Sequence, residues 1–303
     1  MTSRERLIEV GARAAARATT RRVRAVAQLV LLAALVFVVL RARSLWHGSH
    51  IELGRLNWVA LIAALVLGAA GTAAGALIWL AILDTLGMQT RLRYSALFLQ
   101  AQLGKYIPGS IWQYAGRAAI ARAHGIPVRP VGVSLPVEFV ASAVAAGSMA
   151  AFLLGWWGSF AVAGVGLILA IGMRSRRIRG PATLATTRAT LLYLPVWLAL
   201  GGSFWLCARG LVATPAHDLA FYTGAFAVAW LAGLLAIYAP GGLGVREAVL
   251  VALLSSRIRA ADALVVAAAS RLILVFVDVS LAGVATLTLR RARRPQIDVA
   301  DPA

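Results

Sequence analysis

The sequence predicts an all-α integral membrane protein with about seven or eight transmembrane helices, two further helices being broken by Pro-Gly. Apolar residues make up 61% of the chain and charged residues 14%, with a mean hydropathy of +0.82. Soluble domains are roughly half apolar and about a quarter charged. Runs of about 20 apolar residues, the length that crosses a bilayer core, recur along the whole chain. The polar gaps between these runs are too short for a water-soluble domain.

Seven apolar runs are expected to span the membrane: residues 25–43, 58–83, 131–155, 157–173, 189–208, 219–238 and 262–289. Two shorter stretches, 94–126 and 239–257, are apolar but interrupted by Pro-Gly. We therefore expect three parts: a basic cytoplasmic segment at 1–24, a polytopic transmembrane domain at 25–290 and a short cytoplasmic tail at 291–303.

The net charge of +19 is concentrated beside the apolar runs, which indicates membrane topology and contact with anionic lipids, not nucleic acid. The strongest arginine clusters lie at 4–24, 174–179 and 290–294, and the positive-inside rule places all three in the cytoplasm. Both termini are then cytoplasmic, if 94–126 and 219–257 each enter the membrane and return. Almost all basic residues are arginine, a composition typical of a GC-rich bacterial genome, so we expect the cytoplasmic (inner) membrane of a bacterium.

An internal repeat links the two broken stretches. At a constant offset of 132, LFLQAQLGKYIPGS at 97–110 aligns with AWLAGLLAIYAPGG at 229–242, and both copies contain Y-x-P-G. Three predicted crossings separate the copies, so they would enter from opposite sides as an inverted repeat. Paired broken helices of this kind are typical of transporters, whose binding sites lie where the half-helices meet. The alternative is a pair of ordinary loops between short helices.

Proline and glycine explain why a helix would stop within the membrane. Proline removes a backbone donor, and glycine tolerates dihedral angles that other residues avoid. The N–H groups of the following half-helix then carry a partial positive charge into the protein. The residues assigned to these structural loops are Pro108, Gly109, Ser110, Pro240, Gly241, Gly242 and Gly244.

Ionisable residues inside apolar segments cost about 2.5–3.5 kcal/mol each on insertion scales, so each needs a partner or a function. Arg271 and Asp278 are seven residues apart on one helix face, too far to pair at about 1.5 Å per residue. We expect Glu138 or Glu247 to pair with Arg271, and Arg117 or Arg246 to pair with Asp278. Lys105, beside Tyr106, is the chain's one lysine.

These charges are either structural ion pairs or part of a binding site. Counting Lys105 and the three arginines, four cations face three carboxylates, and the excess of positive charge favours an anion such as a lipid phosphate. The residues assigned to substrate binding are Lys105, Tyr106, Arg117, Arg246, Glu247 and Arg271, with Glu138 and Asp278 as their charge partners. A single cysteine and four scattered histidines give no metal site, and no cofactor is expected.

Two stretches also resemble a known family. LGKYIPGSIWQYAGR at 103–117 and APGGLGVRE at 239–247 resemble the transmembrane flippase-like domain of the lysylphosphatidylglycerol synthase family, over residues 25–290. The first stretch departs from the P-G-x-x-G-E form of the aminoacyl-lipid synthases, and the chain has no soluble synthase domain after the membrane part. The resemblance implies a stand-alone member that moves a phospholipid or a lipid-linked sugar across the membrane.

Three functions are compatible with these sequence features. The first is a lipid flippase, whose partners are anionic phospholipids or lipid-linked sugars. The second is a membrane accessory that has partner proteins in lipid or cell-envelope biosynthesis. The third is an enzyme acting on a lipid phosphate, for which the predicted membrane segments offer no H-E-x-x-H, no D-x-D pair and no histidine beside a carboxylate. We therefore expect a transporter-like protein and not an enzyme.

Overall fold

A computed structural model describes residues 51, 53–106, 112–154, 180–236, 242 and 244–291, and these residues form helices without any strand. The helices are η1 (Leu53–Arg55), α2 (Trp58–Thr85), η2 (Leu92–Tyr94), α3 (Ser95–Ala101), η3 (Gln102–Tyr106), α4 (Trp112–Ala123), α5 (Val128–Leu154), α7 (Pro181–Leu211), η4 (Ala216–Asp218), α8 (Leu219–Leu235), α9 (Val245–Leu254) and α10 (Ala260–Arg291). The spans predicted at 25–43 and 157–173 lie outside the described residues, as do both predicted terminal segments.

Five stretches in the described part of the chain are long and apolar enough to cross a membrane: α2, α5, α7, η4 with α8, and α10. They correspond to the five predicted spans that fall within the described residues, which confirms the prediction of an all-α, multi-pass membrane protein. Helix α7 begins at Pro181, about two turns before the expected position. A proline at the first helical position has no N–H to leave unpaired, so the helix can begin there.

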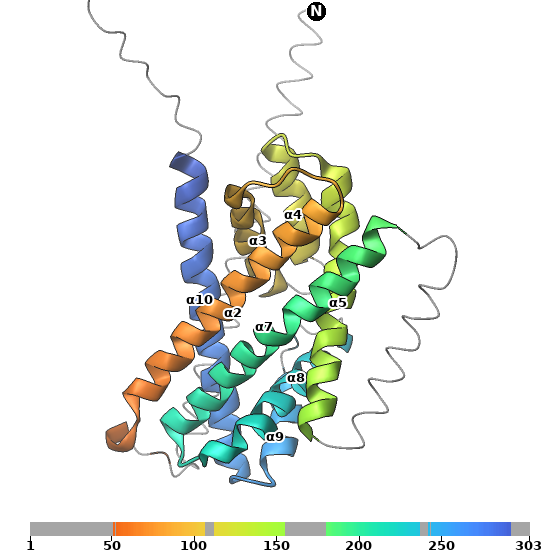
Figure 1. Cartoon of the computed structure of the whole chain (residues 1–303). Coiled ribbons are helices and arrows are strands. Elements are labelled where there is room, and N and C mark those ends of the chain that lie inside the picture. The colour runs from red at the N-terminus through yellow and green to blue at the C-terminus, as the bar shows by residue number, and fades with distance from the viewer. Residues whose placement is uncertain are drawn as a thin grey trace, which may run out of the picture.

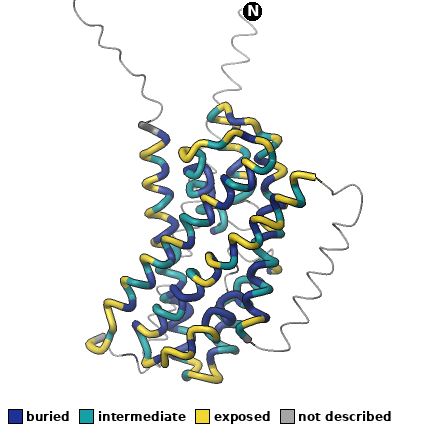
Figure 2. The backbone as a smooth tube through the Cα atoms, viewed as in Figure 1, coloured by how far each residue is buried: buried dark blue, intermediate teal, exposed yellow. Residues whose placement is uncertain are grey.

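Exposed positions lie along the outside of these helices (Figure 2), and many of them carry large apolar side chains. Val59 and Phe152 are 78% and 82% exposed, and Val66, Leu191 and Val284 are also exposed. A soluble monomer rarely exposes contiguous apolar patches larger than a few hundred Å². This surface is therefore suited to contact with lipid tails.

Small residues allow α2 and α7 to pack closely along their lengths. A Cβ atom on Gly71 would lie 3.0 Å from Leu200, and one on Gly68 would lie 3.0 Å from the Ser203 hydroxyl. That hydroxyl donates a 2.6 Å hydrogen bond to the carbonyl of Ala64. Close backbone approach through small residues is how helices associate in membranes, where no water drives them together.

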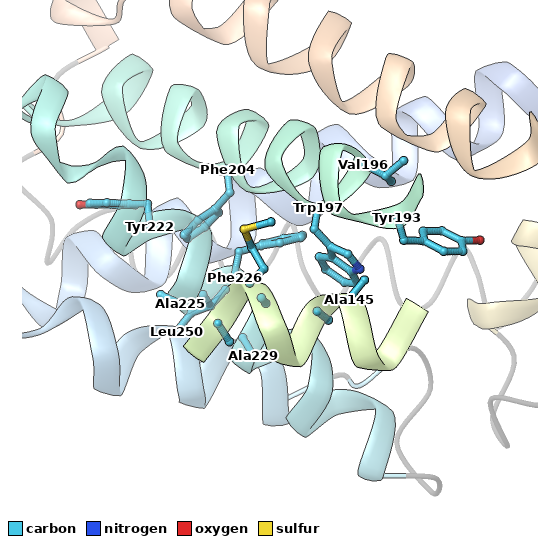
Figure 3. Close-up of a cluster of buried hydrophobic side chains, with 14 of the residues drawn as sticks. Ala145, Tyr193, Val196, Trp197, Phe204, Tyr222, Ala225, Phe226, Ala229 and Leu250 are labelled. Atoms are coloured by element: carbon cyan, nitrogen blue, oxygen red, sulfur yellow. The ribbon is translucent and has the colours of Figure 1, made fainter. Parts of the chain in front are cut away.

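Aromatic rings form the centre of the bundle between α7 and α8 (Figure 3). Phe226 of α8 lies between Phe204 and Trp197 of α7, with ring centroids 5.5 Å and 6.4 Å away. Trp197 also meets Trp230 edge-to-face at 4.8 Å. Offset and edge-to-face rings are the favoured aromatic arrangements, so this row fixes α8 against α7.

The short helices lie at opposite ends of the bundle (Figure 1). The segment with α3, η3 and α4 connects the end of α2 to the start of α5 at one end. The segment with α8 and α9 connects the end of α7 to the start of α10 at the other end. A hydrogen bond of 3.0 Å from the Asn57 N–H to the Gly210 carbonyl places the start of α2 beside the end of α7. Each segment thus begins and ends at one end of the bundle.

Neither Pro-Gly stretch is described as one continuous helix. In the first, η3 ends at Tyr106 and α4 begins at Trp112, while in the second α8 ends at Leu235 and α9 begins at Val245. Pro108, Gly109, Ser110, Pro240 and Gly241 lie outside the described residues. Gly242 and Gly244 have φ angles of +70° and +82°, which L side chains rarely adopt. The predicted need for glycine is confirmed at these two positions.

Candidate functional site

A cavity of about 200 Å³ lies between the two Pro-Gly stretches. It is bordered by α2, α5, α7 and α10 as well as by both short segments. Six of the predicted site residues contact it: Lys105, Tyr106, Glu138, Arg246, Glu247 and Arg271. Gly242 also contacts it. Charged residues more than 100 positions apart in the sequence are therefore brought to one cavity.

The first ion pair, Arg117 with Glu138, lies deepest in the protein. Both guanidinium Nη atoms of Arg117 donate to the carboxylate of Glu138, the Nη2–Oε1 distance being 3.0 Å. The rings of Phe98, Trp79 and Tyr114 surround the guanidinium, the closest centroid being 4.5 Å away. Arg117 is 1% exposed and does not contact the cavity. Arg117, which we predicted to bind substrate, therefore does not line the cavity in this structure. Its partner Glu138 does line the cavity.

Asp278 of α10 pairs with the first Pro-Gly stretch. Its Oδ2 atom is 2.7 Å from the Lys105 ammonium and accepts a 2.5 Å hydrogen bond from the Tyr106 hydroxyl. Asp278 is 2% exposed, so both partners compensate a carboxylate that is removed from solvent. Our prediction that Arg117 or Arg246 pairs with Asp278 is wrong. The reason is that η3 brings the lysine next to α10, whereas α4 directs Arg117 towards α5.

Glu247 pairs with Arg271 across α9 and α10. The Arg271 Nη1 atom donates to Glu247 Oε1 at 2.6 Å, which confirms one of the two predicted partners. The other oxygen of Glu247 accepts a 2.7 Å hydrogen bond from the Gly244 N–H, which caps the start of α9. A carboxylate in the first turn of a helix is also favoured by the helix dipole.

In these three ion pairs, each of the three carboxylates of the predicted cluster has a cationic partner. Arg246 is the one cation of that cluster that is not in any of the three pairs. Within the described part of the chain, Arg246 forms no ion pair with a carboxylate, and its guanidinium lies 5.3 Å from the centroid of the Phe226 ring. It is partly exposed, and it contacts the cavity. The excess positive charge predicted for the cluster is therefore located on one side chain that contacts an open space.

Two residues that seat Arg246 were not predicted from the sequence. Gly233 lies against the aliphatic part of the arginine, and Phe226 provides the ring under its guanidinium. Both belong to α8, an apolar helix in which glycine and phenylalanine are common. Nothing in the sequence therefore distinguishes these two residues as part of a binding site. Pairing these positions with Arg246 requires the fold, because the chain turns back between α8 and α9.

The cavity wall combines aromatic and polar neutral side chains around these charges. Tyr114, Phe139, Trp197 and Trp230 contact the cavity, and so do Gln102, Gln113, Ser142 and Ser270. This arrangement can bind an anion at Arg246 and donate hydrogen bonds to it from neutral groups. A lipid phosphate has the required charge and can accept two hydrogen bonds from one guanidinium.

No protein-family model matches this chain, and no curated protein matches it.

Proposed function

We propose that this protein is a lipid flippase that moves an anionic phospholipid or a lipid-linked sugar across the membrane. The observation that carries the proposal is Arg246, a guanidinium without a carboxylate partner in the described residues that contacts the cavity between the two Pro-Gly stretches. An unpaired cation in a membrane segment is costly, and a ligand with the opposite charge compensates it. In this proposal the lipid phosphate is that ligand.

We further propose that the two segments are re-entrant helices forming an inverted repeat among seven or eight spans. The support is that each segment begins and ends at one end of the bundle, that the two ends are opposite, and that both segments contact one cavity. Transporters with inverted repeats bind their substrates at such a position and open it alternately to each side. The same arrangement is expected of a protein that passes a lipid head group across the bilayer.

The proposed orientation places the end of the bundle with α3 and α4 in the cytoplasm. Arg91, Arg93, Arg122 and Arg129 lie in or next to the helices of that end, and α10 finishes there with Arg290 and Arg291. The opposite end carries Arg55, Arg209, Arg257 and Arg259 together with Asp218 and Asp262. The larger positive load is expected on the inside, so the C-terminus, and by the predicted topology the N-terminus, is cytoplasmic in a bacterial inner membrane.

The family resemblance supports the same class of function. Arg246 and Glu247, which the resemblance includes, both contact the cavity, and Gly242 and Gly244 of the same stretch have the backbone angles that require glycine. We propose a flippase-like member of the lysylphosphatidylglycerol synthase family that transports its lipid and does not transform it. Membrane lipids are its expected partners.

The test compares Arg246→Lys with the wild type at equal abundance in liposomes, using a fluorescent phosphatidylglycerol whose movement between leaflets is followed by quenching. Lysine keeps the charge but cannot bind two phosphate oxygens in one plane, so we expect lipid movement to be lost while folding is kept. Arg209→Lys is the matched control, because Arg209 is exposed at one end of the bundle. Equal movement by Arg246→Lys and the wild type would contradict the proposal.

A separate outcome identifies the accessory function. If the purified wild type binds glycerol 3-phosphate but moves no lipid, the site recognises a head group without transporting it. That result would assign the protein to a lipid or cell-envelope assembly complex and would reject the flippase.

A further inference from the structure

A second space lies on the outside of the bundle, between α2 and α7. It is a groove of about 400 Å³ whose wall consists entirely of apolar residues. Its residues are Ala70, Gly71, Ala74, Leu77, Ile78 and Ala81 of α2, with Leu192, Pro195, Val196 and Ala199 of α7. Five of these ten residues are glycine or alanine, and their small size leaves room for the depression.

The groove and the charged cavity share two residues. Gly71 and Val196 contact both spaces, so the two spaces adjoin at these residues. On the cavity side, the neighbouring residues of the same two helices are Thr72 and Gly75 of α2, with Tyr193, Trp197 and Leu200 of α7. The two spaces therefore meet between α2 and α7: one is internal and contains the charged side chains, and the other is apolar and faces the membrane.

The groove is open to the lipid phase. Leu77 is 52% exposed and Leu192 is 45% exposed, and Ala70 and Pro195 are also exposed. A transmembrane helix is about 10–12 Å across with its side chains and would lie over a depression of this size, not in it. A hydrocarbon chain is narrow and flexible enough to fill it.

We propose that this groove binds an acyl chain of the same lipid whose phosphate is held at Arg246. The inference rests on the proposed function and adds a second binding site to it. A head group beside the charged side chains of the cavity and a tail in the apolar groove would each meet matching chemistry. Because Gly71 and Val196 border both spaces, the head and the tail of one lipid molecule are within reach of the two sites. The tail would then stay in the membrane while the charged head crosses.

The first part of the test maps where lipid tails contact the protein. The wild type is placed in phosphatidylcholine vesicles that contain a phosphatidylglycerol with a photoreactive diazirine on its acyl chain. After irradiation, modified peptides are identified by mass spectrometry. We expect adducts to be concentrated on residues 70–81 and 192–199. Adducts spread evenly over all exposed apolar positions, including Val66 and Val284, would overturn the inference, because the groove would then be ordinary lipid-facing surface.

The second part fills the groove. Ala70→Trp adds a ring at an exposed position in the groove wall, and Val66→Trp adds the same ring at an exposed position of α2 outside it. We expect Ala70→Trp to move phosphatidylglycerol about tenfold more slowly than the wild type, the effect of leaving about two methylene groups unburied. Both variants are expected to bind glycerol 3-phosphate, which has no tail, as the wild type does.

The remaining outcomes separate this inference from the proposed function. Unchanged lipid movement by Ala70→Trp would overturn the groove assignment and leave the role of Arg246 standing. Cross-links from 70–81 to a second copy of the chain, in place of lipid adducts, would identify the groove as a protein interface and would also overturn it. If the wild type neither binds glycerol 3-phosphate nor moves lipid, the proposed function fails, and the adduct map alone decides whether a tail occupies the groove.

Discussion

Gly233 lies directly against the side chain of Arg246, and a Cβ atom at Gly233 would approach Arg246 Cδ to 2.8 Å. Because that distance is shorter than a van der Waals contact, Gly233→Ala is expected to push the arginine from its place over Phe226. We predict that this variant folds but binds glycerol 3-phosphate more weakly, by about tenfold or more if one charge-assisted hydrogen bond is lost. Equilibrium binding to the purified protein measures the effect.

Gly147→Ala is the matched control for this change, because nothing lies within 4 Å of a Cβ atom at Gly147 in α5. Alanine is a better helix former than glycine by about 0.5–1 kcal/mol, so this control is expected to be as stable as the wild type or more so. If the two alanine variants bind glycerol 3-phosphate equally well, the fit between Gly233 and Arg246 has no role in binding.

Glu138→Gln is predicted to reduce the amount of folded protein. It leaves the guanidinium of Arg117 buried without a counter-ion, a change that costs about 3–5 kcal/mol. The double variant Arg117→Met with Glu138→Leu removes both charges and is expected to recover most of the lost stability. Thermal unfolding in detergent and abundance in membranes are the measurements. A single variant as stable as the wild type would show that Arg117 has another source of compensation.

Asp278 and Tyr106 are predicted to differ in importance although they share a hydrogen bond. Asp278→Asn leaves Lys105 without its carboxylate and is expected to destabilise the protein strongly. Tyr106→Phe removes one hydrogen bond of 2.5 Å and keeps the ion pair, with an expected cost of about 1–2 kcal/mol. Unfolding midpoints of the two variants give the comparison. Similar losses for both would mean that the hydroxyl, and not the ammonium, compensates Asp278.

The proposed orientation predicts which end of the bundle is accessible from outside the cell. In a Cys207→Ala background, Ala216→Cys is expected to react with a membrane-impermeant maleimide in intact cells. Leu92→Cys is expected to react only after the membrane is permeabilised. Both positions are exposed in short 3₁₀ helices, η4 and η2, at opposite ends of the bundle. The reverse labelling pattern would invert the topology.

The sequence predicted the class of fold and much of the site because two signals are strong in a membrane protein. Apolar runs locate the helices, and isolated charges such as Arg271 and Asp278 must find partners. The choice among partners was harder. Arg271 pairs with Glu247 as expected, but Asp278 pairs with Lys105, because the direction in which a short helix turns decides which side chains meet. The residues that contact the Arg246 side chain could not be predicted either. Gly233 makes room for Arg246 only because it has no side chain, and a sequence gives no sign of such a fit.

Helix α10 holds a counter-ion for each of the two short segments. Asp278 binds Lys105 from one end of the bundle, and Arg271 binds Glu247 from the other, about 10 Å apart on the same helix face. Moving one segment outward breaks one of these pairs and leaves the other intact, whereas moving both at once breaks two. The state in which the site is open to both sides is therefore the least stable of the possible openings. In the proposed flippase, these two ion pairs on α10 would favour opening to one side at a time over a continuous leak through the protein.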